Sequence, residues 1–158
     1  MMLVNAYAPL LFRICLVVLF PFSAVDKIRN WDAAMQQAGG LPFKPQMLVL
    51  SIVVEIVTPI CIVTGWHDRL AAFVLAGFCV ITALLFHQFW RFPAFWRFEP
   101  GEGLEHFWEF LKNFGLVGGL GLIMLSSGTL PASQVAQHPL TSSSVIGPQA
   151  GRPLPPPR

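Results

Sequence analysis

The sequence predicts an all-α integral membrane protein: an antiparallel four-helix bundle with a short interfacial helix and a disordered C-terminal tail. Three observations predict this fold class. Apolar residues make up 54% of the 158 residues and charged residues 11%, whereas soluble domains contain about 25% charged residues. Four apolar stretches are long enough to cross a bilayer. One link between them, residues 65–69, is so short that the stretches it joins must form an antiparallel hairpin.

The first predicted span covers residues 9–25. Pro21 lies inside it and is expected to kink the helix, because proline cannot donate the hydrogen bond to the carbonyl four residues back. Arg13 lies near the start of the span, where its side chain either reaches the lipid headgroups or turns inward to an acidic partner. Lys27 lies just past the span and marks its aqueous end.

A longer connector follows, residues 26–46, and the sequence predicts a short helix within it at residues 31–38. Asn30 is a residue type that often caps the start of a helix, and the Gly39-Gly40 pair is expected to end it. We expect this helix to lie at the membrane interface rather than to cross the bilayer.

The second predicted span, residues 47–64, carries one carboxylate at its middle, Glu55. A charge at that depth costs about 2.5–3.5 kcal/mol on insertion scales, so it normally faces protein or water. Pro59 has no N–H to offer the carbonyl of Glu55, which leaves a backbone acceptor at the same position. Either Glu55 is structural, in a buried ion pair or protonated, or it handles protons or binds a ligand.

The third and fourth predicted spans cover residues 70–89 and 104–126. The fourth contains Gly115 and Gly119 in a GxxxG pair, which favours a close helix contact within the bundle or with a partner subunit, including a second copy of the chain. The membrane domain is therefore predicted to cover residues 1–128. Residues 129–158 are rich in Pro, Ser and Gly and are predicted to be disordered.

Polar residues on three of the spans fall in the same half of the predicted bundle, near the two longer connectors. We expect an intramembrane polar core there, with Glu55 paired to Lys112 because each charge would otherwise lie alone in lipid. The predicted core consists of Glu55, Lys112, Asn113 and His87, and the candidates for lining a ligand site are Arg13, Lys27, Trp90 and His106. The core is interpreted as a structural lock, a site for a quinone or another small polar ligand, or a path for protons or ions.

The aromatic run at residues 86–98 is the expected interfacial or ligand-facing edge of this core. It holds seven aromatic residues and two arginines in thirteen residues, a composition typical of the aromatic belt at a membrane surface.

Other functions find little support in the sequence. There is no cluster of Lys and Arg, so nucleic-acid binding is not expected. The sequence shows no metal-ligand spacing, so no metal is predicted. It also shows no nucleophile elbow, so an independent enzyme of the soluble type is not expected. Cys15, Cys61 and Cys79 are isolated within apolar runs and are interpreted as small core residues. His87 and His106 are weak haem candidates because both are expected near a membrane face.

Several short motifs together resemble those of the DoxX family of small four-helix bacterial inner-membrane proteins, over roughly residues 10–126. The motifs are Ser23-Ala24-x-x-Lys27, Glu55 in the middle of a span, Gly65-x-x-x-Arg69, Phe86-His87-x-x-Trp90 and Phe110-Leu-Lys-Asn113. The combination of the last two is the most specific part of the resemblance.

The resemblance implies a multi-pass protein of the bacterial plasma membrane. The family takes its name from a subunit associated with quinone-linked sulfur-compound oxidation in archaea, and other members resemble membrane anchors of oxidoreductase complexes. It therefore favours an accessory or anchoring subunit of a quinone-linked redox complex, without a complete active site of its own. The alternatives are a quinone-reactive oxidoreductase subunit and a small transporter or proton-conducting protein. The expected partners are the lipid bilayer and a larger membrane complex, and quinone is the cofactor that the resemblance suggests.

Overall fold

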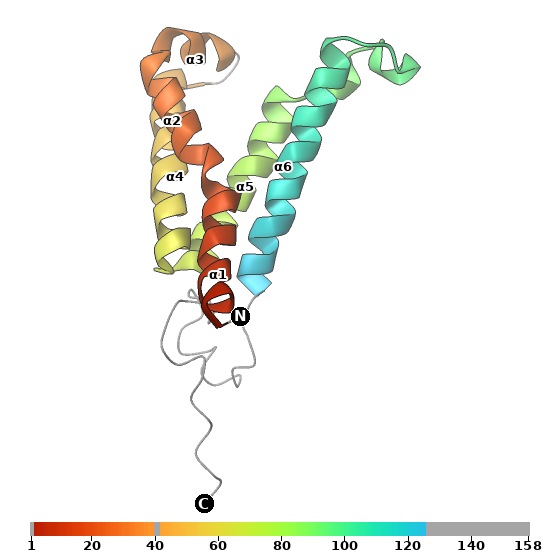
Figure 1. The fold of residues 1–158 in the computed structure, drawn as a ribbon. Helices are drawn as coiled ribbons and strands as arrows, with labels where there is room; N and C mark the ends of the chain where they lie inside the picture. Colours follow the sequence, from red (N-terminus) through yellow and green to blue (C-terminus); the bar gives the residue numbers. More distant parts are fainter. Residues whose placement is uncertain (1, 40–41, 126–158) are drawn as a thin grey trace, which may run out of the picture.

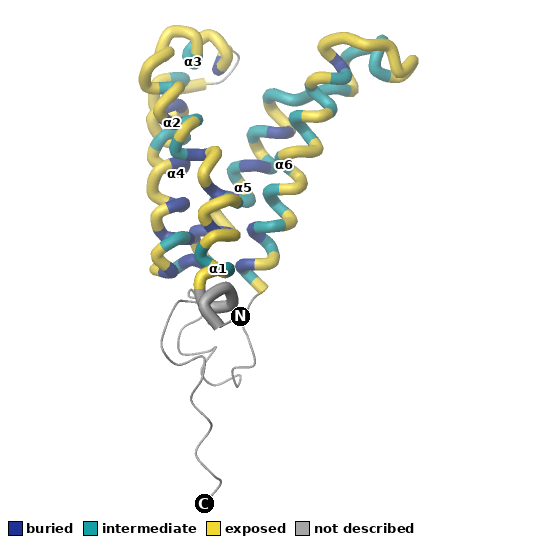
Figure 2. Tube along the Cα trace, in the orientation of Figure 1, coloured by how far each residue is buried: buried dark blue, intermediate teal, exposed yellow. Residues whose placement is uncertain are grey.

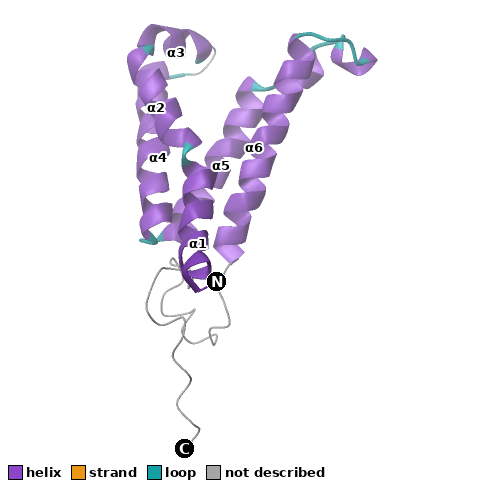
Figure 3. Ribbon diagram, viewed as in Figure 1, coloured by secondary structure: helices purple, strands orange, loops and turns teal. Residues whose placement is uncertain are grey.

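The computed structural model describes residues 2–39 and 42–125, and every regular element in these two ranges is a helix (Figures 1 and 3). The α-helices are α1 (Met2–Val17), α2 (Leu19–Arg29), α3 (Trp31–Gln37), α4 (Lys44–Thr64), α5 (Asp68–Phe86) and α6 (Glu102–Leu125), and two 3-10 turns, η1 (Phe89–Arg91) and η2 (Phe95–Arg97), separate α5 from α6. The predicted disordered tail lies outside the described residues.

Four segments are long and apolar enough to cross a membrane, which confirms the predicted four-span fold. They are Tyr7–Arg29, Lys44–Thr64, Asp68–Arg91 and Glu102–Leu125. Successive spans run in opposite directions, so α3, η1 and η2 all lie at one end of the bundle (Figure 1). We call this the connector end, and the opposite end, which holds the link at residues 65–67, the turn end.

The first span is interrupted by one residue between α1 and α2, Val18, which keeps helical backbone angles (φ −59°, ψ −29°). The break falls at Val18, three residues before Pro21. Pro21 has no N–H to donate to the carbonyl of Val17, and this carbonyl ends α1. The span therefore bends at this point: α2 leans away from the line of α1 (Figure 1) and packs against α4.

The short helix predicted in the first connector is present as α3, one residue shorter than expected. Asn30 does not cap it with its side chain, contrary to the prediction. Instead its Nδ2 donates to Oδ1 of Asp26 at 2.7 Å, because Asp26 lies one helical turn earlier on α2.

The bundle has two arms that meet at the turn end (Figure 1). One arm consists of α2 and α4, with α3 across its connector end, and the other of α5 and α6. Buried residues gather where the arms meet with α1, as Figure 2 shows. Cys61 and Cys79 belong to this core, as predicted, but Cys15 is exposed on α1 and is not a core residue.

The two glycines of the predicted GxxxG pair have different surroundings. A Cβ added at Gly119 would lie 2.6 Å from Cδ1 of Leu16, so Gly119 permits the close approach of α1 to α6 within the bundle. A Cβ added at Gly115 would meet nothing within 4 Å. Gly119 therefore forms a helix contact within the bundle, whereas the space next to Gly115 is open.

Candidate functional site

A polar cluster lies between α2 and α4, at the middle of the membrane-spanning part of α4. Glu55 is only 3% exposed, and its Oε1 accepts from Lys27 Nζ at 2.5 Å and from Ser23 Oγ at 3.1 Å. Lys27 Nζ also donates to Ser23 Oγ at 3.1 Å. We call these three residues the Ser-Lys-Glu triad.

Local helix geometry explains why α2 supplies two members of the triad. Ser23 and Lys27 are four residues apart, so they lie one above the other on the same face of α2. That face packs against α4, where Glu55 is buried. The ammonium group of Lys27 also lies over the ring of Phe78 on α5, with Nζ 5.9 Å from the ring centroid. At this distance the cation is attracted to the face of the ring.

The second carboxylate oxygen of Glu55 is buried and has no hydrogen-bond partner among the described residues. Buried polar atoms in proteins nearly always have a partner, because an unmade hydrogen bond is costly in a medium without water. Pro59 adds to this local demand for donors, since it cannot donate to the backbone carbonyl of Glu55. The triad therefore has capacity for at least one more hydrogen-bond donor.

The predicted pairing of Glu55 with Lys112 is wrong. Lys112 Nζ donates to Oε1 of Glu109 at 2.5 Å, three residues earlier on α6, and its side chain is 67% exposed. Asn113 Nδ2 donates to the backbone carbonyl of Glu109 at 3.0 Å. Both side chains are satisfied along α6, so neither reaches across to α4.

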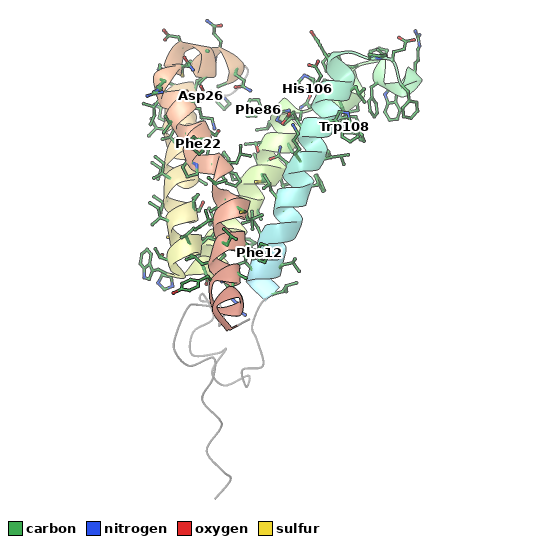
Figure 4. The ribbon with its side chains drawn as sticks, in the orientation of Figure 1. Phe12, Phe22, Asp26, Phe86, His106 and Trp108 are labelled. Atoms are coloured by element: carbon green, nitrogen blue, oxygen red, sulfur yellow. The ribbon has the colours of Figure 1, made fainter. Side chains whose placement is uncertain are left out.

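The structure places His87 with His106 rather than with Glu55. Their ring centroids are 5.8 Å apart, and the His106 ring stacks on Phe92 at 5.1 Å. Trp90 packs edge-on against Phe110 at 5.9 Å. Figure 4 shows His106 near the connector end of α6, away from the middle of α4. No group of three or more potential metal ligands occurs among the residues described here.

Arg13 belongs to a second buried polar cluster, near the turn end. Its Nη1 donates to Oδ2 of Asp68 at 2.7 Å and to the carbonyl of Ile62 at 2.6 Å. Arg13 is 7% exposed and Asp68 is fully buried. Of the two orientations that the sequence left open for Arg13, the inward one is therefore observed, and it ties α1 to the hairpin of α4 and α5.

Of the eight predicted site residues, the structure brings Lys27 into contact with Glu55 and His87 into contact with His106. Ser23 and Asp68 also belong to the buried polar clusters, but they were not predicted as site residues. The missed signal for the triad was the i, i+4 spacing of Ser23 and Lys27 in a span that neighbours Glu55. The missed signal for Asp68 was its place at the N-terminal end of α5, where a carboxylate is stabilised by the helix dipole.

The arrangement of the triad allows both hydrogen-bond donation and acceptance in an apolar setting. The single O–H of Ser23 is donated to Glu55, whereas Lys27 donates two of its three N–H groups within the triad and keeps the third. Glu55 keeps Oε2, for which the described residues supply no donor. The Lys27 side chain is 23% exposed, more than Glu55 at 4%. A polar molecule at this position would thus meet Lys27 first and Glu55 behind it.

Comparison with known proteins identifies a matching family model and two similar proteins. The family model named DoxX matches residues 8–88, which include all three members of the triad and both members of the Arg13–Asp68 pair. The inner membrane protein YphA of Escherichia coli (strain K12) is 25% identical over 119 residues, covering 74% of this chain and 81% of YphA. The inner membrane protein YqjF of the same organism is 28% identical over 114 residues, covering 72% of this chain and 79% of YqjF. No solved structure matches the chain.

Proposed function

This chain belongs to the DoxX family, and from that premise we propose that it is an inner-membrane accessory subunit of a quinone-linked redox assembly whose Ser-Lys-Glu triad holds a quinone head group. The inner-membrane location rests on four spans of sufficient length and on the names of the two relatives, both of which are inner membrane proteins. The redox role rests on the resemblance of the family to subunits of quinone-linked complexes.

The observation that carries the proposal is the buried Oε2 of Glu55, to which none of the described residues donates a hydrogen bond. A purely structural ion pair is expected to satisfy both carboxylate oxygens, since an unsatisfied buried acceptor is destabilising by about 1–3 kcal/mol. An oxygen that receives no donor from the described residues is instead suited to a donor on a ligand. Its neighbour Oε1 is held by Lys27 and Ser23, which fixes the orientation of the carboxylate.

The residue types of the triad fit both redox forms of a quinone. Lys27 has three N–H groups and donates two of them within the triad, and the third suits a carbonyl oxygen of the oxidised head group. Glu55 accepts, which suits the hydroxyl groups of the reduced form. Phe78 supplies an aromatic surface near Lys27, and a bound quinone would supply two-electron, two-proton chemistry to the assembly.

Photoaffinity labelling tests the site directly. The full-length protein in nanodiscs is irradiated with an azido-quinone, with and without excess decylubiquinone, and labelled peptides are mapped by mass spectrometry. We expect competable labelling on segments of α2, α4 or α5 that border the triad. Glu55→Gln and Lys27→Gln should each lower it about tenfold or more, because each removes a charged hydrogen-bonding partner worth about 1.5–3 kcal/mol.

Asp26→Asn is the matched control, since Asp26 is an exposed carboxylate next to Lys27 on α2. Its labelling should equal that of the wild type. Equal labelling of the wild type and Glu55→Gln, or labelling that decylubiquinone does not reduce, would contradict the proposal.

A structural role for the triad is the second candidate, and the short contact between Lys27 and Glu55 favours it. In that case the pair stabilises the packing of α2 on α4, and the chain serves as an anchor without a ligand of its own. The two candidates differ in the expected effect of removing both charges together.

A further inference from the structure

The connector between α5 and α6, residues 87–101, contains a repeated triplet, and both copies form the same structure. Phe-Trp-Arg occurs at residues 89–91 and again at residues 95–97. Each copy is a 3-10 turn, η1 and η2. The two turns pack on each other at the connector end, beside the start of α6 (Figure 1).

The phenylalanines of the two turns form a shared interior. The ring centroids of Phe89 and Phe95 are 4.7 Å apart, and both rings pack against Phe107 of α6, at 5.2 and 5.1 Å. Gly103 allows the connector to pack closely against the start of α6, because a Cβ at this position would lie 2.7 Å from Cβ of Phe92. The two turns are thus held in place by packing against α6.

The other two residues of each triplet are exposed, although one edge of Trp90 also packs against Phe110. Trp90 and Trp96 are 40% and 65% exposed, and Arg91 and Arg97 are exposed as well. Arg91 has no acidic partner in the described part of the chain. Arg97 lies 4.0 Å from Glu99, with the two side chains 72% and 56% exposed, and exposed contacts of this kind contribute little. Both guanidinium groups are therefore available to a ligand.

We propose that the paired Phe-Trp-Arg turns form a binding site for the phosphate groups of anionic phospholipids. η1 forms the last three residues of one span, which ends at Arg91, and η2 lies between that span and the next, which begins at Glu102. Both turns therefore lie where the chain leaves the hydrocarbon layer for the lipid headgroups. Tryptophan is enriched at that depth because its ring is apolar and its N–H is polar. Arginine binds phosphate oxygens through two parallel hydrogen bonds.

Of the three acidic residues near the turns, Glu99 forms the exposed contact with Arg97 described above. Glu102 and Glu105 belong to the first turn of α6, where the positive end of the helix dipole stabilises negative charge. The outward face of the turns themselves is formed by two indole rings and two guanidinium groups. This composition is complementary to an anionic, partly apolar headgroup layer.

Native mass spectrometry with added lipid tests the proposal. The full-length protein in detergent is titrated with phosphatidylglycerol and, separately, with zwitterionic phosphatidylcholine. We expect preferential binding of phosphatidylglycerol, and the double variant Arg91→Gln/Arg97→Gln should weaken that binding about thirtyfold, since each basic residue near an anionic surface contributes about a factor of five. Arg91→Lys/Arg97→Lys should lose less, because the charge remains and only the paired hydrogen bonds are lost.

Arg29→Gln/Lys44→Gln is the matched control. It removes two positive charges from the other connector at the same end of the bundle and should leave phosphatidylglycerol binding unchanged. An equal loss in this control would overturn the proposal, because it would show a response to net charge alone. Unchanged lipid binding in the Arg91→Gln/Arg97→Gln variant would also overturn the proposal. If this variant loses a co-purifying protein subunit while its lipid binding stays the same, the arginines bind a protein, and the proposal is overturned as well. If the double variant does not fold, Arg91→Gln alone is measured, with an expected loss of about fivefold.

Discussion

Replacing Arg13 with Leu should destabilise the protein by about 3–5 kcal/mol, because it leaves the carboxylate of Asp68 buried without its charged partner. Asp68 has no solvent exposure, and Arg13 Nη1 lies 2.7 Å from its Oδ2. The same substitution removes the hydrogen bond to the carbonyl of Ile62 at the end of α4. The free energy of unfolding of the purified protein, measured by denaturant titration in mixed micelles, reports this loss.

Lys112→Met is the control for this experiment. It breaks an ion pair of similar N–O distance, but Lys112 and Glu109 are 67% and 47% exposed, so the expected change is below about 1 kcal/mol. A loss in Arg13→Leu no larger than in Lys112→Met would mean that the Arg13–Asp68 pair does not hold the turn end together.

Substitutions in the Lys27–Glu55 pair should change the free energy of unfolding, and the size of the change should depend on whether one charge or both are removed. Lys27→Met leaves Glu55 buried between α2 and α4 and should destabilise the protein by about 3 kcal/mol. The double variant Lys27→Met/Glu55→Leu should recover most of this loss, because replacing both members of a buried ion pair with apolar residues is often neutral. The free energies of unfolding of the wild type, both single variants and the double variant form the complete cycle.

The double variant also separates the two candidate functions of the triad. If the triad binds a quinone, Lys27→Met/Glu55→Leu regains stability but not competable quinone labelling. If the triad is only a structural lock, Lys27→Met/Glu55→Leu should regain both its stability and the wild-type function of the chain. A double variant as unstable as Lys27→Met would instead show that the triad contributes more to folding than its paired charges.

The sequence predicts the spans well because the thickness of the bilayer limits where an apolar helix can begin and end. It also identifies Glu55, since a carboxylate in the middle of an apolar stretch is unusual on energetic grounds alone. Hydropathy places a residue along the membrane normal but does not say which way it faces around its helix. For this reason the expected partner of Glu55, Lys112, lay at a plausible depth but on the wrong helix.

The partner of Glu55 depends on a local feature with a tertiary consequence. Pro21 ends α1 early, and α2 then packs against α4 and brings Ser23 and Lys27 to Glu55. Proline predicts that a helix is disrupted but not the direction of the segment that follows. Likewise, the aromatic composition of residues 86–98 predicts an interfacial segment, whereas the packing of its two turns on α6 becomes clear only from the structure.

The central claim, that the triad holds a quinone, is tested most directly by native mass spectrometry of the protein extracted from its own membranes in mild detergent. We expect a quinone-sized mass bound to the wild-type chain, retained in Asp26→Asn and absent from Glu55→Gln. A wild-type chain that carries no such mass, or Glu55→Gln that carries as much quinone as the wild type, would contradict the account.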